Sequence, residues 1–186
     1  MNTLIKKLQL KRALYSTVLK QAFHSLERET VYCQLIEIPT FRSPIGISIR
    51  KNGNAATVEF IEMHTGSKTL YRQRAVVDSA QAQQLFVDLE GLSLKPNLKA
   101  STLQGRDGSE FELTIGTAGK GTTSYQWLNC ETPDHWKPLD ELVDRIQAIA
   151  QHTKVAPTEI PYTFTLELDE SAIAVTWNLT DIPPIP

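Results

Sequence analysis

The chain has 186 residues, of which 41% are hydrophobic and 22% are charged, as in an ordinary globular protein. No apolar run approaches the roughly 20 residues that a membrane span needs, and the basic start lacks the apolar segment of a secretory signal. The two cysteines, Cys33 and Cys130, are most simply reduced thiols, so we expect a cytoplasmic protein.

The net charge of −2 conceals an asymmetry between the two halves of the chain. Residues 1–100 contain 14 Lys and Arg against 8 Asp and Glu, a net of +6. Residues 101–186 contain 5 against 13, a net of −8. Such a division marks either a partner-binding face or two halves that attract each other within one fold. We favour the second interpretation.

Residues 3–28 are predicted to form an amphipathic helix, because apolar residues recur at spacings of three and four. These residues are Leu4, Leu8, Tyr15, Val18, Leu19, Ala22, Phe23 and Leu26. Five basic residues precede the first acid, Glu27, which would suit an anionic membrane surface or an organelle-targeting segment. The bulky Tyr15 and Phe23 suit a core, so we favour a helix that packs on its own protein.

The next segment is predicted to form a meander of strands followed by a helix. Strands are expected at residues 31–38, from 45, at 57–63 and at 68–77. Asn52-Gly53 is a strong hairpin signal between the second and third strands. Asp78 is a suitable N-cap for a helix over residues 79–90, and Gly91 is a suitable end for it.

The best-defined periodicity lies in residues 105–150. Apolar and polar residues alternate from Phe111 to Ile115 and predict one strand, and Tyr125 and Trp127 predict a second. The connection between them, GTAGKGT, contains three glycines and is expected to be mobile. An apolar stripe that follows Pro138, a residue suited to the first helical position, then predicts an amphipathic helix up to the end of this stretch.

After a linker at residues 153–161 comes a last hairpin, with strands at 162–168 and 173–177, and a proline-rich tail that should be extended. Together these elements predict an α+β fold, in which an antiparallel sheet of meander and hairpins is packed by about three helices. We expect residues 1–30 to hold the N-terminal amphipathic helix and residues 31–186 to form a single α+β domain.

The sequence contains no recognisable catalytic, cofactor or metal signature. The GTAGKGT connection does not match a phosphate-binding loop, because Thr114 stands where that motif needs a glycine and a strand follows. Cys130, Asp134 and His135 lie in one loop and could supply a nucleophile, an orienting acid and a base, or two metal ligands. We favour a polar loop without chemistry and keep a Cys/His-dependent, hydrolase-like enzyme as the alternative.

The middle strands carry five basic residues, Arg42, Arg50, Lys51, Arg72 and Arg74. A nucleic-acid platform would interleave aromatic residues with them, whereas Tyr71 belongs to the opposite strand face from Arg72. Nucleic-acid binding is therefore not favoured. It remains a further alternative, together with a membrane-peripheral role through the basic N-terminal half.

Two tryptophans of the central stretch admit two interpretations. Trp127 and Trp136 could form an exposed recognition pair, because tryptophan is common among binding hot spots. We favour packing in the core, with Trp136 at the entry of the helix.

Residues 105–150 also contain a series of motifs: Asp107-Gly108, Phe111-Glu112-Leu113, Tyr125-Gln126-Trp127, and then Pro133, Trp136, Pro138 and Leu139. This series resembles small uncharacterised bacterial proteins with a DG–strand–YxW–PxxW–PL–helix layout. Some of those proteins stand beside polymorphic toxins as immunity-type partners. The resemblance covers this stretch only, implies no active-site residues and favours a binding role.

The leading hypothesis is a cytosolic, non-enzymatic protein that binds and neutralises another protein, such as a basic toxin or nuclease. Acidic surfaces speed association with basic partners, and the second half of the chain is acidic. The candidate contact consists of acids on a strand and on a helix, with one tryptophan: Glu110, Glu112, Trp136, Asp140, Glu141 and Asp144. No catalytic residue, metal or cofactor is assigned.

Overall fold

A computed structural model describes residues 3–23, 30–92, 94, 108–128, 132, 134–151, 156–168 and 173–179. Its elements in chain order are α1 (Thr3–Ala22), β1 (Val31–Pro39), β2 (Ile45–Asn52), β3 (Ala55–His64), β4 (Thr69–Val76), α2 (Ser79–Glu90), β5 (Ser109–Thr117), β6 (Gly121–Leu128), the short 3-10 helix η2 (Asp134–Trp136), α3 (Lys137–Gln151), β7 (Thr158–Leu168) and β8 (Ile173–Leu179). The fold is α+β, as the sequence predicts.

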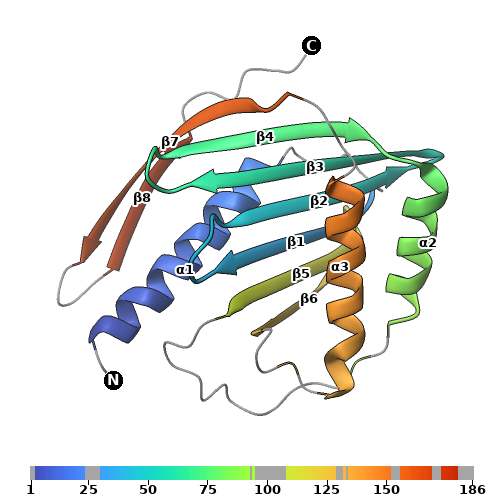
Figure 1. Ribbon diagram of the computed structural model, residues 1–186, viewed down its shortest axis with the longest axis horizontal. Coiled ribbons are helices and arrows are strands. Elements are labelled where there is room, and N and C mark those ends of the chain that lie inside the picture. The colour runs from blue at the N-terminus through green and yellow to red at the C-terminus, as the bar shows by residue number, and fades with distance from the viewer. Residues whose placement is uncertain are drawn as a thin grey trace.

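One antiparallel sheet organises the described residues, with the strand order β6-β5-β1-β2-β3-β4-β7-β8. Strands β1 to β4 form a meander, the β5–β6 hairpin joins it along β1, and the β7–β8 hairpin joins it along β4. Helix α1 lies on one face of the sheet, and α2 and α3 lie on the other (Figure 1). The sheet is therefore the middle of three layers.

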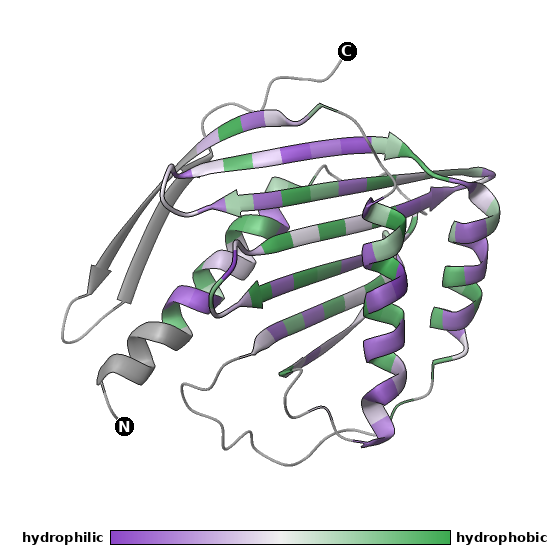
Figure 2. Ribbon diagram, viewed as in Figure 1, coloured by the Kyte–Doolittle hydropathy of each residue, from purple (hydrophilic) through white to green (hydrophobic). Residues whose placement is uncertain are grey.

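Alternation along the strands supplies a core to each face of this sheet. In β1, Cys33 and Leu35 belong to the core beneath α2 and α3, whereas Ile36 and Ile38 belong to the core beneath α1. The hydropathy colours of the ribbon alternate accordingly along the strands and around α3 (Figure 2). Because most central strands bury both faces, a polar residue within them needs a partner.

The predicted features of α2 and α3 are confirmed. The Asp78 carboxylate accepts a hydrogen bond of 2.8 Å from the Ala80 N–H and caps α2, and Gly91 is the C-cap that follows its last residue, Glu90. In α3 the buried stripe is the predicted one: Leu139, Leu142, Val143, Ile146, Ile149 and Ala150. Both helices thus attach to the sheet through one apolar face and leave the other face to solvent.

Helix α1 packs on its own protein, which confirms the interpretation that we favoured. Val18 and Leu19 are almost completely buried, in a cluster with Ile36 and Ile61 of the sheet. A Cβ atom at Gly46 would lie 2.8 Å from the ring of Phe23, so glycine at this position allows the helix to approach β2 closely.

Three details differ from the expectations. The predicted linker includes Thr158–Pro161, which pairs with β4 as the first part of β7, because Ile160 buries its side chain in the core beneath α1. The two strands extend into the glycine-rich connection and leave residues 118–120 as a turn, closed by a hydrogen bond of 2.9 Å from the Lys120 N–H to the Thr117 carbonyl. Strand β3 begins two residues earlier than expected, at Ala55.

Several predicted features lie outside the described residues. They are the end of the first helix at residues 24–28, the loop that holds Cys130, residues 153–155 of the linker and the proline-rich tail.

Candidate functional site

Glu110 and Glu112 lie on the α1 face of β5, where cations of α1 meet them. Lys20 forms an ion pair with Glu112, Ser16 donates a hydrogen bond of 2.9 Å to its other oxygen, and Arg12 lies 3.6 Å from Glu110. Burial alone would raise the pKa of Glu112, but the Lys20 and Ser16 contacts outweigh burial and hold that pKa below its usual range. Burial raises the pKa of Glu110. These two acids therefore hold α1 in place.

The three acids of α3 lie in the helix layer on the opposite side of the sheet. One Asp140 oxygen accepts hydrogen bonds from Trp127 Nε1 at 3.2 Å and from Thr132 Oγ1 at 3.3 Å, so this residue joins the helix start to β6. Glu141 and Asp144 are exposed. The structure therefore divides the predicted contact between two faces and leaves Glu141 and Asp144 as its solvent-facing acids.

Trp136 and Trp127 pack in the core, as the favoured interpretation expects. Trp136 is 8% exposed and makes an edge contact with Tyr125, with ring centres 6.0 Å apart. Trp127 stacks on Phe111 at 5.4 Å. These rings fix the start of α3 against β5 and β6, and they offer little surface to a partner.

The residues of the alternative enzyme are only partly described. Cys130 lies outside the described residues, His135 is exposed on η2, and Asp134 pairs with Lys137 at 2.7 Å. The other thiol, Cys33, is completely buried, and burial raises its pKa to about 12. A thiol of that pKa is not a nucleophile at neutral pH.

The two helix layers differ strongly in charge. Helix α1 contains five Lys and Arg residues and no acid. The other layer, α2 with its N-cap together with η2 and α3, contains seven Asp and Glu residues and two cations, a net of −5. The cations are Lys137, paired with Asp134, and Arg145, paired with Asp88. We call this layer the acidic helix layer.

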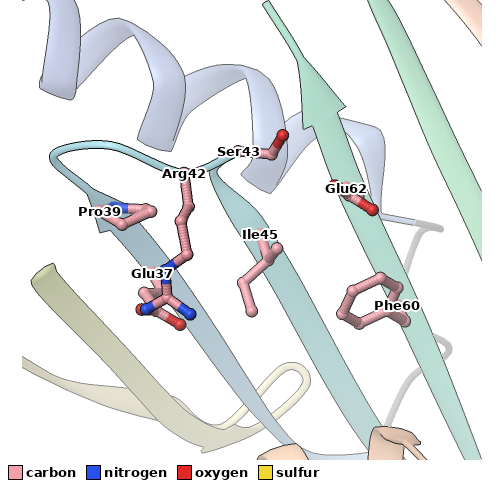
Figure 3. A pocket seen from close by; sticks show the side chains of 7 residues that line it. All are labelled: Glu37, Pro39, Arg42, Ser43, Ile45, Phe60 and Glu62. Atoms are coloured by element: carbon pink, nitrogen blue, oxygen red, sulfur yellow. The ribbon is translucent and has the colours of Figure 1, made fainter.

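A pocket of about 260 Å³ opens near the turn between β1 and β2, and its lining residues Ile45 and Phe60 also pack against the core beneath α2 and α3, so the pocket lies on the same side of the sheet as the acidic helix layer. Its lining residues are Glu37, Pro39, Arg42, Ser43, Ile45, Phe60 and Glu62. Ile45 and Phe60 project from neighbouring strands, and Arg42 reaches back from the turn to Glu37 (Figure 3). The pocket therefore combines an apolar wall with charged groups.

Glu37 is the most constrained group of this pocket. It is 4% exposed, and one of its oxygens accepts hydrogen bonds from Ser109 at 2.7 Å and Arg42 at 3.2 Å. The other oxygen accepts from Gln147 of α3 at 2.9 Å. A carboxylate with both oxygens engaged is a poor general base. The lining residues include no histidine or cysteine to activate Ser43, so the pocket is suited to recognition.

This pocket was not predicted from the sequence, although the sequence contains a signal for it. Glu37 is the one charged residue in the apolar strand VYCQLIEIP, and an acid at such a position must find partners when the strand is buried. The partners themselves could not be predicted, because Ser109 and Gln147 are 72 and 110 residues away along the chain.

Within the described ranges, no group of three or more His, Cys, Asp or Glu residues is arranged to hold a metal ion. Among the same residues, no helix is both long enough and apolar enough to cross a membrane. Comparisons with models of known protein families, with curated proteins and with solved structures found no match.

Proposed function

We propose that the chain is a cytosolic, non-enzymatic protein that binds a basic protein partner through the acidic helix layer. The net charge of −5 on that layer is the observation that carries this proposal. A toxin-neutralising role is the specific form that we favour, because toxins that act on nucleic acids are themselves commonly basic.

The fold supports such a role by separating its charges. Helix α1 lies on the opposite face of the sheet from α2 and α3, and its Arg12 and Lys20 pair with Glu110 and Glu112. These cations therefore do not neutralise the negative charge of the acidic helix layer. An acidic surface attracts a basic partner over a distance of about one Debye length, roughly 8–10 Å at physiological salt. This attraction raises the association rate and selects against acidic proteins.

The pocket and the adjoining turn add a second element of recognition. Phe41, at the turn between β1 and β2, is 80% exposed, and Val87 of α2 is 48% exposed. Exposed aromatic residues beside a pocket are typical anchors of protein interfaces. Glu62 would favour a basic side chain of the partner near the apolar wall of Ile45 and Phe60.

The test begins with the chain as bait in its native host and identification of the retained protein by mass spectrometry. The retained protein is then purified and titrated with the wild type and with the double variant E141K/D144K. Both positions are exposed, so the substitutions should leave the fold intact. We expect the affinity to fall by about tenfold or more and to lose most of its salt dependence.

The matched control is Q21K, which adds a positive charge at an exposed position of α1, on the opposite face of the sheet from the acidic helix layer. It should bind like the wild type. Equal affinities for the wild type and E141K/D144K would contradict the proposal, and so would an acidic retained protein.

A further inference from the structure

A group of charged residues is buried on the α1 side of the sheet, beyond the apolar contacts of the helix. Ile47 and Ile49 of β2 face α2 and α3, so Ser48 and Arg50 face the opposite side. Register then places Glu59 opposite both Ser48 and Arg74, and Arg50 opposite Thr57. Arg50, Glu59, Arg72 and Arg74 form what we call the arginine cluster. Three of them are at most 8% exposed, and Arg74 is exposed.

The contacts within the arginine cluster are unequal. Arg50 is satisfied, since its Nη2 donates to Glu59 at 2.7 Å and its Nε donates to Ser48 at 3.0 Å. Within the described ranges, the polar contact of Arg72 is a long one, in which its Nε lies 3.8 Å from the other oxygen of Glu59. Both terminal nitrogens of Arg72 are buried and have no hydrogen-bond partner among the residues that the structure describes.

A buried guanidinium group without partners is energetically costly. Burial lowers the pKa of Arg72, the nearby carboxylate of Glu59 raises it, and the nearby charge of Arg74 lowers it. The guanidinium group nevertheless remains protonated at neutral pH. Its four terminal N–H bonds therefore need acceptors, which the described part of the chain does not supply. Unsatisfied buried groups of this kind call for a specific explanation in a native fold.

We infer that the arginine cluster is a binding site for a phosphate group, either free or carried by a small phosphomonoester. The unpartnered end of Arg72 would hold two of its oxygens in a bidentate contact. The exposed Arg74, on the same strand face two residues along, marks the side from which the ligand enters.

Charge selects a phosphate over a carboxylate. Three guanidinium groups and the single carboxylate of Glu59 leave a net charge of +2. A phosphate group carries about two negative charges above pH 7, whereas a carboxylate carries one. This site lies on the opposite face of the sheet from the acidic helix layer, so the inference does not depend on the proposed function.

The test is calorimetric titration of the full chain at pH 8 and constant ionic strength in chloride. One arm uses inorganic phosphate, a second uses phenyl phosphate, and a third uses acetate. We expect saturable binding of at least one phosphate compound with a dissociation constant below about 1 mM, and binding of acetate at least about tenfold weaker. Binding of inorganic phosphate alone would identify the ligand as the free ion.

Variants locate the site. R72M and R74M should each weaken phosphate binding by about tenfold or more, because each removes a charged hydrogen-bond donor. K120M, which removes an exposed cation in the turn between β5 and β6, should bind like the wild type. If R72M does not fold, R74M carries the test, because its side chain is exposed. Absence of phosphate binding by the wild type, or unchanged binding by R74M, would overturn the inference.

Discussion

Replacing Glu112 by glutamine should loosen the attachment of α1 to the sheet. The substitution keeps the size of the side chain and a hydrogen-bond acceptor for Ser16, but it removes the charge that Lys20 contacts. Hydrogen bonds to charged groups contribute about 1.5–3 kcal/mol when they are buried. The Glu112 side chain is 9% exposed but that of Lys20 is 42% exposed, so solvent screening reduces the expected loss to about 1–2 kcal/mol.

The effect of this substitution should depend on pH in a defined direction. The pKa of Glu112 in the folded protein lies below its usual value. Its stabilising contribution is therefore fully present above the unfolded-state pKa, about 4.3, and is lost as the pH falls through the folded-state pKa. Wild type and E112Q should differ most in free energy of unfolding at pH 7 and should converge as the pH falls below about 4.

Urea unfolding at a series of pH values measures this difference. E141Q, at an exposed acid of α3, is the matched control and should stay within about 0.5 kcal/mol of the wild type. A double-mutant cycle of E112Q with K20M isolates the coupling between the two residues. A difference below about 0.3 kcal/mol at pH 7, or one that grows as the pH falls, would refute this reasoning.

Three further predictions follow from single contacts. E37A should destabilise the protein by about 2–4 kcal/mol in urea unfolding, because it leaves the buried Ser109 and the Gln147 amide without their acceptor; a loss below about 1 kcal/mol would contradict this. G46A should destabilise by about 1–3 kcal/mol through the clash with Phe23, and F23L should relieve most of that loss. Because burial raises the pKa of Cys33 to about 12, iodoacetamide at pH 8 should label it only as fast as the protein unfolds, and rapid labelling detected by peptide mass spectrometry would exclude the described environment.

Local patterns were sufficient to predict many of the elements. Asp78 and Gly91 delimit α2 because capping depends on neighbouring backbone groups only. The stripe of α3 and the alternation of β5 are repeated over enough residues to indicate both the element and its buried side. The antiparallel class followed from short turns such as Asn52-Gly53, which can join only adjacent strands.

The arrangement of those elements could not be predicted, because it depends on contacts between distant residues. Nothing local indicates that β5 pairs with β1, where Val31 meets Thr117, or that Thr158 begins a strand beside β4. The candidate site has the same origin. In the sequence, Glu112 and Glu141 both stand at positions where a polar, solvent-facing residue is expected. The fold shows that Lys20 of α1 contacts Glu112, whereas Glu141 is exposed.

Hydrogen exchange of the chain alone and in complex with its partner tests the central claim most directly. The claim is that a basic protein docks on the acidic helix layer, while α1 packs against the opposite face of the sheet and does not contact the partner. Binding should slow amide exchange in α2, in α3 and at the turn that carries Phe41, and should leave α1 unchanged. Slower exchange in α1 alone, with α2 and α3 unaffected, would contradict the account.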